Sequence, residues 1–308
     1  MKIEVLLTET EICHEFSEAL EARDIPEKFF YWSPLAVRSW LALSRDVAFE
    51  SNRHSWNLLV SGIDTFAESL DARVAVVSLG AGDGAQDVML LKALRETGRT
   101  TDYFPVDASQ GLLEMACAAA EDAEVDALGI KADISSPFHL VLASDASDRP
   151  KIFVLSGNTL GAFDPVDQIG HLARLMREAD RLVVDFEIHD AAAMTGRDGP
   201  VGRRFATGPL ATVGVTREDG EVRFELKRDD RCSGLQVITR HMQVARDLKV
   251  RCPDREVLIQ RGERVNLNFS YTYTSDAVRW LVEEHAGLRI LEEIPSPDGR
   301  FVTAVCAK

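Results

Sequence analysis

Strand-like and helix-like stretches alternate through the middle of this 308-residue chain, between residues 73 and 188. The strand-like stretches are short and rich in β-branched residues, whereas the stretches between them place apolar residues at helical spacing. The strand-like stretches are VAVVSLG, DYFPVD, KIFVLSG and DRLVVDFEI, and the helix-like ones are AQDVMLLKALRE, SQGLLEMACAAAE and DPVDQIGHLARLMREA. This alternation is typical of βαβ units and predicts an α/β fold with a doubly wound, mostly parallel sheet.

The regions on either side of this core have a different pattern. Helices are expected over residues 8–23, from near Ser33, over residues 53–70 and over residues 275–285. Turn signals between short alternating stretches predict hairpins after residue 190, and a last hairpin should close the core sheet on its edge. We therefore expect four parts: an N-terminal helical segment (1–70), a Rossmann-like cofactor-binding core (71–190), a β-rich substrate lobe (191–270), and a C-terminal helix and hairpin (271–308).

Composition argues against several classes of partner. The net charge is −15, so DNA or RNA would be repelled, and a small-molecule substrate is the better expectation. No apolar stretch is long enough to span a bilayer and the first residues do not resemble a signal peptide, so we expect no membrane partner and a cytoplasmic location. The five cysteines form no CxxC pair and the histidines do not cluster, which favours reduced thiols and no metal site. A monomer and a homodimer both remain open.

Three glycines stand at alternate positions directly after the first core strand, at Gly80, Gly82 and Gly84. A strand-to-helix turn of this kind lets backbone N–H groups approach a nucleotide-type ligand, and an acidic residue ending the next strand binds its ribose hydroxyls. Asp107 stands in that position. A nicotinamide cofactor favours GxGxxG or GxGxxA, which the chain meets only if Ala85 replaces the third glycine. The GxGxG spacing, the polar turn after KIFVL and the expected C-terminal hairpin favour S-adenosylmethionine instead.

Four blocks of the core, LGAGDGAQD, YFPVDAS, KADISS and FVLSGNTLGAF, resemble the histidine-specific methyltransferase family. That family includes the ergothioneine-pathway histidine Nα-methyltransferases and the fungal dimethylallyltryptophan N-methyltransferases. The PEKFFY and GERVNLNFSYTY segments are similar to further blocks of the family, so the resemblance covers most of the chain and is weakest between residues 190 and 255. It implies a Rossmann-like class I methyltransferase fold and an S-adenosylmethionine-dependent activity.

The resemblance also implies which residues hold the cofactor. Gly80 and Gly82 would approach its methionine part, and Asp107 would bind its ribose. Asp133 would read the adenine amino group, and Tyr31 would close over the cofactor. Asp133 could instead cap a following helix, and Tyr31 could be an ordinary core aromatic. The full expected set is Tyr31, Gly80, Ala81, Gly82, Asp107, Ala108, Asp133, Ile134, Ser156 and Gly157.

On the acceptor side the chain departs from the family. The family's asparagine that holds the amino-acid substrate falls on Ala162, and its substrate tyrosine falls near Ala48 or Phe49. Its late acidic residue becomes Asn268, although the serine that follows survives as Ser270. These changes remove protein groups that would bind the ammonium and the carboxylate of an amino-acid substrate. We therefore predict that plain histidine is a poor substrate. The expected acceptor-binding residues are Phe49, Ala162, Asn268, Ser270 and Tyr271.

Candidate catalytic residues follow two neighbouring strands. Asn158 and Thr159 stand on the polar turn after KIFVL, and Glu187 and His189 alternate with Asp185 at the end of the next strand. Asp185, Glu187 or His189 could take a proton from an amine, although this face could instead be a solvated rim or contact the small lobe. We predict an N-methyltransferase acting on a small amino-acid-like or natural-product acceptor. Transfer to oxygen or carbon, and a non-catalytic binding or scaffold protein of the same fold, remain alternatives.

Overall fold

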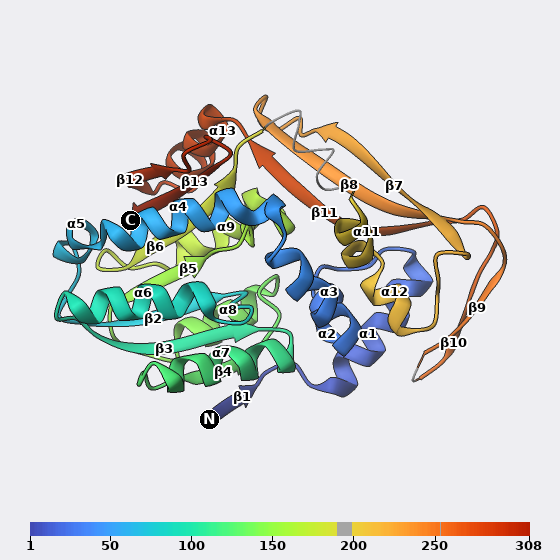
Figure 1. The fold of residues 1–308 in the computed structure, drawn as a ribbon, viewed down its shortest axis with the longest axis horizontal. Coiled ribbons are helices and arrows are strands. Elements are labelled where there is room, and N and C mark those ends of the chain that lie inside the picture. Colours follow the sequence, from blue (N-terminus) through green and yellow to red (C-terminus); the bar gives the residue numbers. More distant parts are fainter. Residues whose placement is uncertain (190–198, 253) are drawn as a thin grey trace.

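The structure is a computed structural model that describes residues 1–189, 199–252 and 254–308. Its centre is an eight-stranded sheet with the order β1-β4-β3-β2-β5-β6-β13-β12 (Figure 1). The strands are β1 (Lys2–Val5), β2 (Arg73–Leu79), β3 (Thr100–Asp107), β4 (Leu128–Lys131), β5 (Lys151–Leu155), β6 (Arg181–Glu187), β12 (Arg289–Pro295) and β13 (Phe301–Ala307). The first six in the sheet are parallel, and β13 and β12 are antiparallel. The predicted doubly wound α/β fold and the closing hairpin are confirmed.

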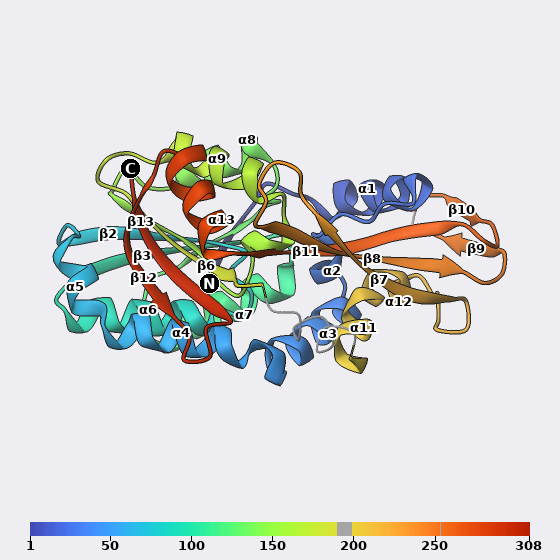
Figure 2. The same ribbon diagram turned by 90° about the horizontal axis from the view of Figure 1, so that it is seen from above.

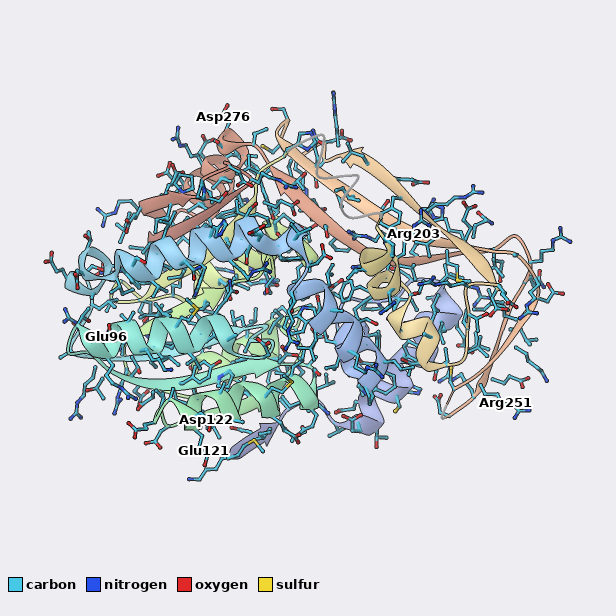
Figure 3. All side chains as sticks on the ribbon, in the orientation of Figure 1. Glu96, Glu121, Asp122, Arg203, Arg251 and Asp276 are labelled. Atoms are coloured by element: carbon cyan, nitrogen blue, oxygen red, sulfur yellow. The ribbon has the colours of Figure 1, made fainter. Side chains whose placement is uncertain are left out.

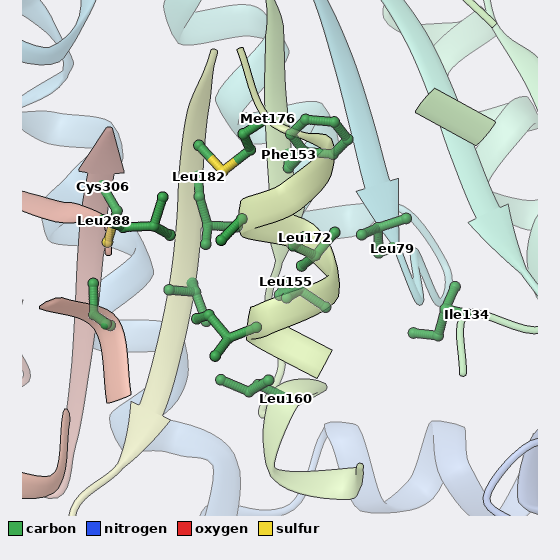
Figure 4. Close-up of a cluster of buried hydrophobic side chains, with 14 of the residues drawn as sticks. Leu79, Ile134, Phe153, Leu155, Leu160, Leu172, Met176, Leu182, Leu288 and Cys306 are labelled. Carbon is green, nitrogen blue, oxygen red and sulfur yellow. The ribbon is translucent and has the colours of Figure 1, made fainter. Parts of the chain in front are cut away.

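Helices cover both faces of this sheet (Figure 2). One face carries α4 (Glu50–Ser61), α5 (Ile63–Glu68), α6 (Ala85–Glu96) and α7 (Gln110–Asp122), and the other carries α8 (Pro137–Ser144), α9 (Pro165–Leu175), α13 (Ser275–Arg279) and the π-helical turn η3 (Trp280–His285). Successive strand residues point to opposite faces, so each face of the sheet has its own apolar core. Val76 packs in the first core, under α4 to α7, and Val77 packs in the second core, under α8, α9 and α13. Figure 4 shows the second core, where Leu155, Leu172 and Leu182 pack together.

The N-terminal helices begin where the sequence predicts them. Helix α1 (Glu9–Ala22) opens with a capping box in which Thr8 and Glu11 bond to each other's backbone N–H groups. The short α2 (Phe29–Trp32) leads into α3 (Pro34–Ser44), which is capped by Ser33.

Two expectations for the first 70 residues were wrong in detail. The helix expected over 53–70 is two helices, α4 and α5, because the chain breaks at Gly62. The segment is also not wholly helical, since β1 pairs in parallel with β4 and forms one edge of the core sheet. Its four residues are too few to give a recognisable alternation.

Beyond the sheet lies a lobe built on β7 (Gly220–Arg228), β8 (Leu235–Val244) and β11 (Arg264–Tyr273), with a ribbon of β9 (Leu248–Arg251) and β10 (Glu256–Ile259). The lobe is not β-rich throughout, because α11 (Pro200–Ala206) and α12 (Gly208–Thr212) replace the first expected hairpins. Proline in the first turn of each helix explains the error, since GP pairs mark helix starts as well as turns. The expected boundary between core and lobe falls at residues 190 and 191, outside the described residues.

Strand β11 connects the lobe to the core. At its C-terminal end Tyr273 bridges to Ile188, and its ring packs edge-on against Phe186. The lobe sheet, α1, α2, α11 and α12 share a third apolar core. In the described part of the chain, no helix is long and apolar enough to cross a membrane, and no group of acidic, histidine and cysteine side chains could hold a metal ion.

Candidate active site

A cavity of about 380 Å³ lies at the carboxyl ends of β2, β3 and β5. The strand order reverses between β2 and β5, which is where open α/β sheets bind their ligands. The walls are the glycine turn (residues 80–84), the ends of β3 and β4, the turn after β5 (residues 156–163), and side chains from α2, α3 and α4. The volume suits a small-molecule ligand.

The three glycines of the turn serve two purposes, and all have positive φ, at 74°, 57° and 75°. A Cβ on Gly80 would lie 2.9 Å from Thr159 Cγ2, and one on Gly82 would lie 2.6 Å from the Trp40 ring. These two glycines bring the turn against opposing walls of the cavity. A Cβ on Gly84 would instead lie 2.7 Å from Ala116 Cα, so this glycine allows α6 to pack against α7.

Asp107 ends β3 and holds the glycine turn in place. Its carboxylate accepts the Gly82 N–H at 3.1 Å and the Ser109 N–H at 2.8 Å. Burial raises the pKa of Asp107 to about 6, although these backbone N–H groups act in the opposite direction. A carboxylate accepts about four hydrogen bonds, so Asp107 keeps capacity for a ligand's hydroxyl groups.

Asp133 follows β4 and lines the same cavity. It accepts hydrogen bonds from Lys28 Nζ at 2.8 Å and from the Ser135 N–H and hydroxyl at 2.9 and 2.6 Å. Burial acts to raise its pKa, but Lys28 and Ser135 outweigh it and hold the pKa below its ordinary value. The N-cap of α8 is Ser136, so the capping alternative for Asp133 is wrong. Lys28 also lines the cavity; it lies in the PEKFFY segment but is not among the expected cofactor residues.

Tyr31 is both a residue of the cavity wall and a packed aromatic residue, and its role over the cofactor stays a prediction. It lines the cavity, and its ring packs edge-on against Trp40 and near Phe205. Its hydroxyl donates to Glu27 at 2.7 Å. Burial raises the pKa of Glu27 to about 7, because the carboxylate lies away from water.

A buried network fixes the turn after β5. Asp185 accepts the Gly157 N–H at 2.7 Å and the Asn158 N–H at 2.8 Å, and Asn52 Nδ2 donates to it at 2.6 Å. Burial raises the pKa of Asp185 to about 6. These bonds hold Asn158 at φ 62°, an uncommon value for a residue other than glycine. The role of Asn52, on α4, was missed because its partner is 133 positions away.

Comparison with known families decides what kind of site this is. A sequence model of the family described as histidine-specific methyltransferase, SAM-dependent, matches residues 9–194, which is more than half of the chain. The chain belongs to this family. No curated protein matches the sequence of this methyltransferase.

Solved structures give weaker similarities. An S-adenosylmethionine-dependent methyltransferase from Clostridium acetobutylicum ATCC 824 is 12% identical over 82% of this chain and 90% of its own, with a TM-score of 0.43. A 1,6-didemethyltoxoflavin-N1-methyltransferase from Burkholderia thailandensis is 12% identical over 96% and 89%, with a TM-score of 0.45. The glycopeptide N-methyltransferase MtfA is 10% identical over 80% and 92%, with a TM-score of 0.38. These identities and scores are low, so it is the sequence match that gives the family and the observed topology that gives the fold class.

The cofactor of the methyltransferase is S-adenosylmethionine, and the cavity's donors and acceptors fit it. All ten residues expected at the cofactor line the cavity: Tyr31, Gly80, Ala81, Gly82, Asp107, Ala108, Asp133, Ile134, Ser156 and Gly157. The spare acceptor capacity of buried Asp107 suits the two ribose hydroxyls. Asp107 and the glycine turn would hold the ribose and methionine parts, and Asp133 the adenine.

The expected catalytic residues divide into two groups. Asn158 and Thr159 line the cavity, whereas Glu187 and His189 do not. Thr159 donates its hydroxyl to the Ser156 carbonyl at 2.6 Å. Glu187 is buried and accepts from Asn158 Nδ2 at 3.3 Å. His189 contacts Thr272, with 3.5 Å between Nδ1 and Oγ1.

The expected acceptor residues also divide. Phe49 and Ala162 line the cavity, and Asn268, Ser270 and Tyr271 do not. Asn268 is buried, Ser270 contacts Arg240, and the Tyr271 hydroxyl donates to Asp229 at 3.3 Å. The side chain of Ala48 lies outside the described part. The sequence analysis missed further lining residues, among them Lys28, Trp40, Ser44, Arg45, Asn52, Arg53 and Phe163.

Proposed function

We propose that this methyltransferase methylates a nitrogen atom of a small amino-acid-like or natural-product acceptor other than free histidine. The observation that carries the proposal is the state of Asn158. Its side chain borders the cavity, and its Oδ1 atom is buried with no hydrogen-bond partner among the described residues. A net charge of −15 supports a small acceptor rather than a nucleic acid.

An unpartnered buried amide oxygen destabilises a protein by about 1–3 kcal/mol. Asn158 keeps this unpartnered oxygen in a strained backbone conformation that Asp185 holds in place. Both features lower the stability of the folded protein. Glu187 fixes the amide orientation, because a carboxylate can accept only from Nδ2 and so leaves Oδ1 for the ligand. An N–H group of the acceptor would satisfy Oδ1 and be aligned by it.

Bound S-adenosylmethionine supplies an electrophilic methyl group on a sulfonium centre. The protein's task is to present an uncharged nitrogen with its lone pair aligned. For an amine with a pKa of about 8 to 10, losing the proton costs roughly 1.4 to 4 kcal/mol at pH 7. We assign Asn158 the alignment of the N–H group and Glu187 the positioning of Asn158. Thr159 supports the same turn through Ser156.

Two apolar positions support the exclusion of free histidine. Ala162 borders the cavity at the position that corresponds to the family's substrate-binding asparagine, and Phe49 borders it at or next to the position of the family's substrate tyrosine. Neither a phenyl ring nor a methyl group carries a hydrogen-bonding group for a carboxylate, and the ring offers an ammonium only a cation–π contact. The acceptor must therefore be held by other groups.

Methyl transfer from isotopically labelled S-adenosylmethionine to a panel of amines that includes histidine tests the proposal. We expect a product whose fragmentation places the label on nitrogen, and turnover of histidine at least tenfold below that of the best amine. Label on oxygen or carbon would replace the N-methyltransferase assignment. A protein that S-adenosylhomocysteine stabilises against heat, but that methylates nothing, would be a non-catalytic binding protein.

A further inference from the structure

Lys28 is a cation on the cavity wall, outside the set of residues expected at the cofactor. It stands at the start of α2 and lines the cavity together with Asp133. Its Nζ atom lies 2.8 Å from Asp133 Oδ2 and also pairs with Glu15 on α1. The side chains of Lys28 and Asp133 are only 13% and 12% exposed, so this ion pair belongs to the wall of the cavity rather than to the outer surface.

The ion pair joins the N-terminal segment to the end of β4. In Figure 3 the N-terminal helices, in blue, lie between the core sheet and the strands of the lobe. Helices α2 and α3 pack on α7 of the core, and α1 packs on β10 of the lobe. A second ion pair, between Lys131 of β4 and Glu9 of α1, joins the same two parts, and Lys131 does not line the cavity. Joining the segment to the core therefore does not require a lysine at the cavity.

The Lys28–Asp133 pair keeps one donor and one acceptor site that the protein does not use. Asp133 Oδ1 accepts from the Ser135 N–H and hydroxyl, whereas Oδ2 accepts only from Lys28 among the described residues. A carboxylate oxygen has two lone-pair sites, so one remains on Oδ2. An ammonium has three N–H bonds, and within the described part of the chain Lys28 uses two of them for its two carboxylates.

The charges of the pair give it a direction. Burial acts to raise the pKa of Asp133, but Lys28 and Ser135 hold this pKa below its ordinary value, so the carboxyl group stays ionised. An ionised carboxylate can only accept hydrogen bonds, and an ammonium can only donate them. The pair therefore matches a ligand that presents an N–H group next to a lone pair.

Adenine presents this arrangement. Its 6-amino group donates hydrogen bonds, and the ring nitrogens on either side of that group, N1 and N7, accept them. Ala108, Leu112 and Ile134 line the same cavity and provide apolar surface for a purine ring.

We propose that Lys28 and Asp133 recognise the adenine base of S-adenosylmethionine as a pair. Asp133 accepts from the 6-amino group, and Lys28 donates to a ring nitrogen beside it. Lys28 is therefore a specificity-determining residue for the cofactor as well as a link to the N-terminal segment. The inference goes beyond the proposed function, because it depends neither on the acceptor nor on the atom that is methylated.

Analogues of S-adenosylhomocysteine that lack one ring nitrogen test this donor. Calorimetric titration measures the affinity of the wild type, Lys28→Met and Lys131→Met for S-adenosylhomocysteine and for its 1-deaza, 7-deaza and 3-deaza analogues. The 3-deaza analogue is the control ligand, because N3 is on the far side of the ring from the 6-amino group. Lys131→Met is the control variant, because it removes a buried cation that also pairs with α1 but lies outside the cavity.

We expect the wild type to bind either the 1-deaza or the 7-deaza analogue at least tenfold more weakly than S-adenosylhomocysteine, because a hydrogen bond from a charged donor is lost. Lys28→Met should bind S-adenosylhomocysteine and that analogue within threefold of each other, while Lys131→Met keeps the wild-type difference. Replacing N3 should change the affinity by the same factor in all three proteins.

Two results would overturn the inference. One is a wild type that binds the 1-deaza and 7-deaza analogues as tightly as S-adenosylhomocysteine. The other is a full wild-type difference that persists in Lys28→Met, since Lys28 would then only link the N-terminal segment to the core.

If Lys28→Met does not fold, Lys28→Gln takes its place, because glutamine keeps a donor N–H without the charge. It should reduce the wild-type difference at least threefold, and an unchanged difference would overturn the inference. If the wild type binds none of the four ligands, both this inference and the proposed function fail. Every other outcome leaves the proposed function standing.

Discussion

The two halves of the cavity differ in how their polar groups are satisfied. On the cofactor half, the carboxylates of Asp107 and Asp133 accept hydrogen bonds from the protein at both oxygens. On the acceptor half, Asn158 Oδ1 is buried without a partner among the described residues. The polar groups of the first half are satisfied within the protein, whereas the second half retains a polar atom that a ligand can satisfy.

The largest effect on ligand affinity should come from removing the Asp107 carboxylate on the cofactor half. Asp107→Ala removes a buried acceptor and frees the Gly82 and Ser109 N–H groups, so we expect the affinity for S-adenosylhomocysteine to fall about 100-fold. Calorimetric titration measures this. Asp102→Ala is the control, because Asp102 is on the same strand but outside the cavity. A loss below threefold would mean that Asp107 only shapes the glycine turn.

Breaking the acceptor half should leave cofactor binding intact. For Asn158→Ala we expect kcat/KM for the amine acceptor to fall about 30-fold, because an aligning hydrogen bond is lost, while S-adenosylhomocysteine binds within threefold. Asn158→Gly separates the side chain from the backbone, since glycine adopts φ 62° without strain. Equal losses in both variants would assign the effect to the amide. Full activity in the glycine variant would assign it to backbone strain and remove the basis of the proposed function.

The same difference explains what the sequence could predict. The cofactor half is made from residues at the ends of consecutive strands, so motif spacing points to Gly80, Gly82 and Asp107, and the family resemblance adds Asp133. The acceptor half brings together α3, α4 and the turn after β5, which are far apart in the chain. Trp40 and Asn52 stand in ordinary helical stretches, and only the folded structure brings them to the cavity.

The errors of detail in the predicted fold have similar causes. The alternating core and the closing hairpin were readable because each strand or helix has its own periodic pattern. Strand β1 is too short for such a pattern and forms only by pairing with β4, more than 120 positions away in the chain. Helices α11 and α12 are short and begin at Gly-Pro pairs, which local rules assign to turns.

The pH dependence of cofactor binding should follow the protonation of Asp107 on the cofactor half. Asp107 has a pKa of about 6, and a ligand that donates hydroxyl groups to it prefers the charged form. Binding of S-adenosylhomocysteine should therefore weaken as the pH falls through 6, by about tenfold between pH 7 and pH 5. Calorimetry across this range measures it. Asp107→Asn should bind weakly but with a flat profile, and a slope that persists would point to Asp185, whose pKa is also about 6.

The smallest effect should come from restoring one polar group to the acceptor half. Ala162 borders the cavity where the family has an asparagine, so Ala162→Asn returns a hydrogen-bonding group for the acceptor. One such bond contributes about 0.5 to 1.5 kcal/mol, so we expect kcat/KM for free histidine to rise between about twofold and tenfold. Ala162→Leu adds similar volume without the amide and should lower it. If histidine turnover also rises in the leucine variant, filling space rather than hydrogen bonding limits histidine. If neither variant changes it, the missing amide is not what excludes histidine, and Phe49 on the same cavity wall becomes the next position to vary.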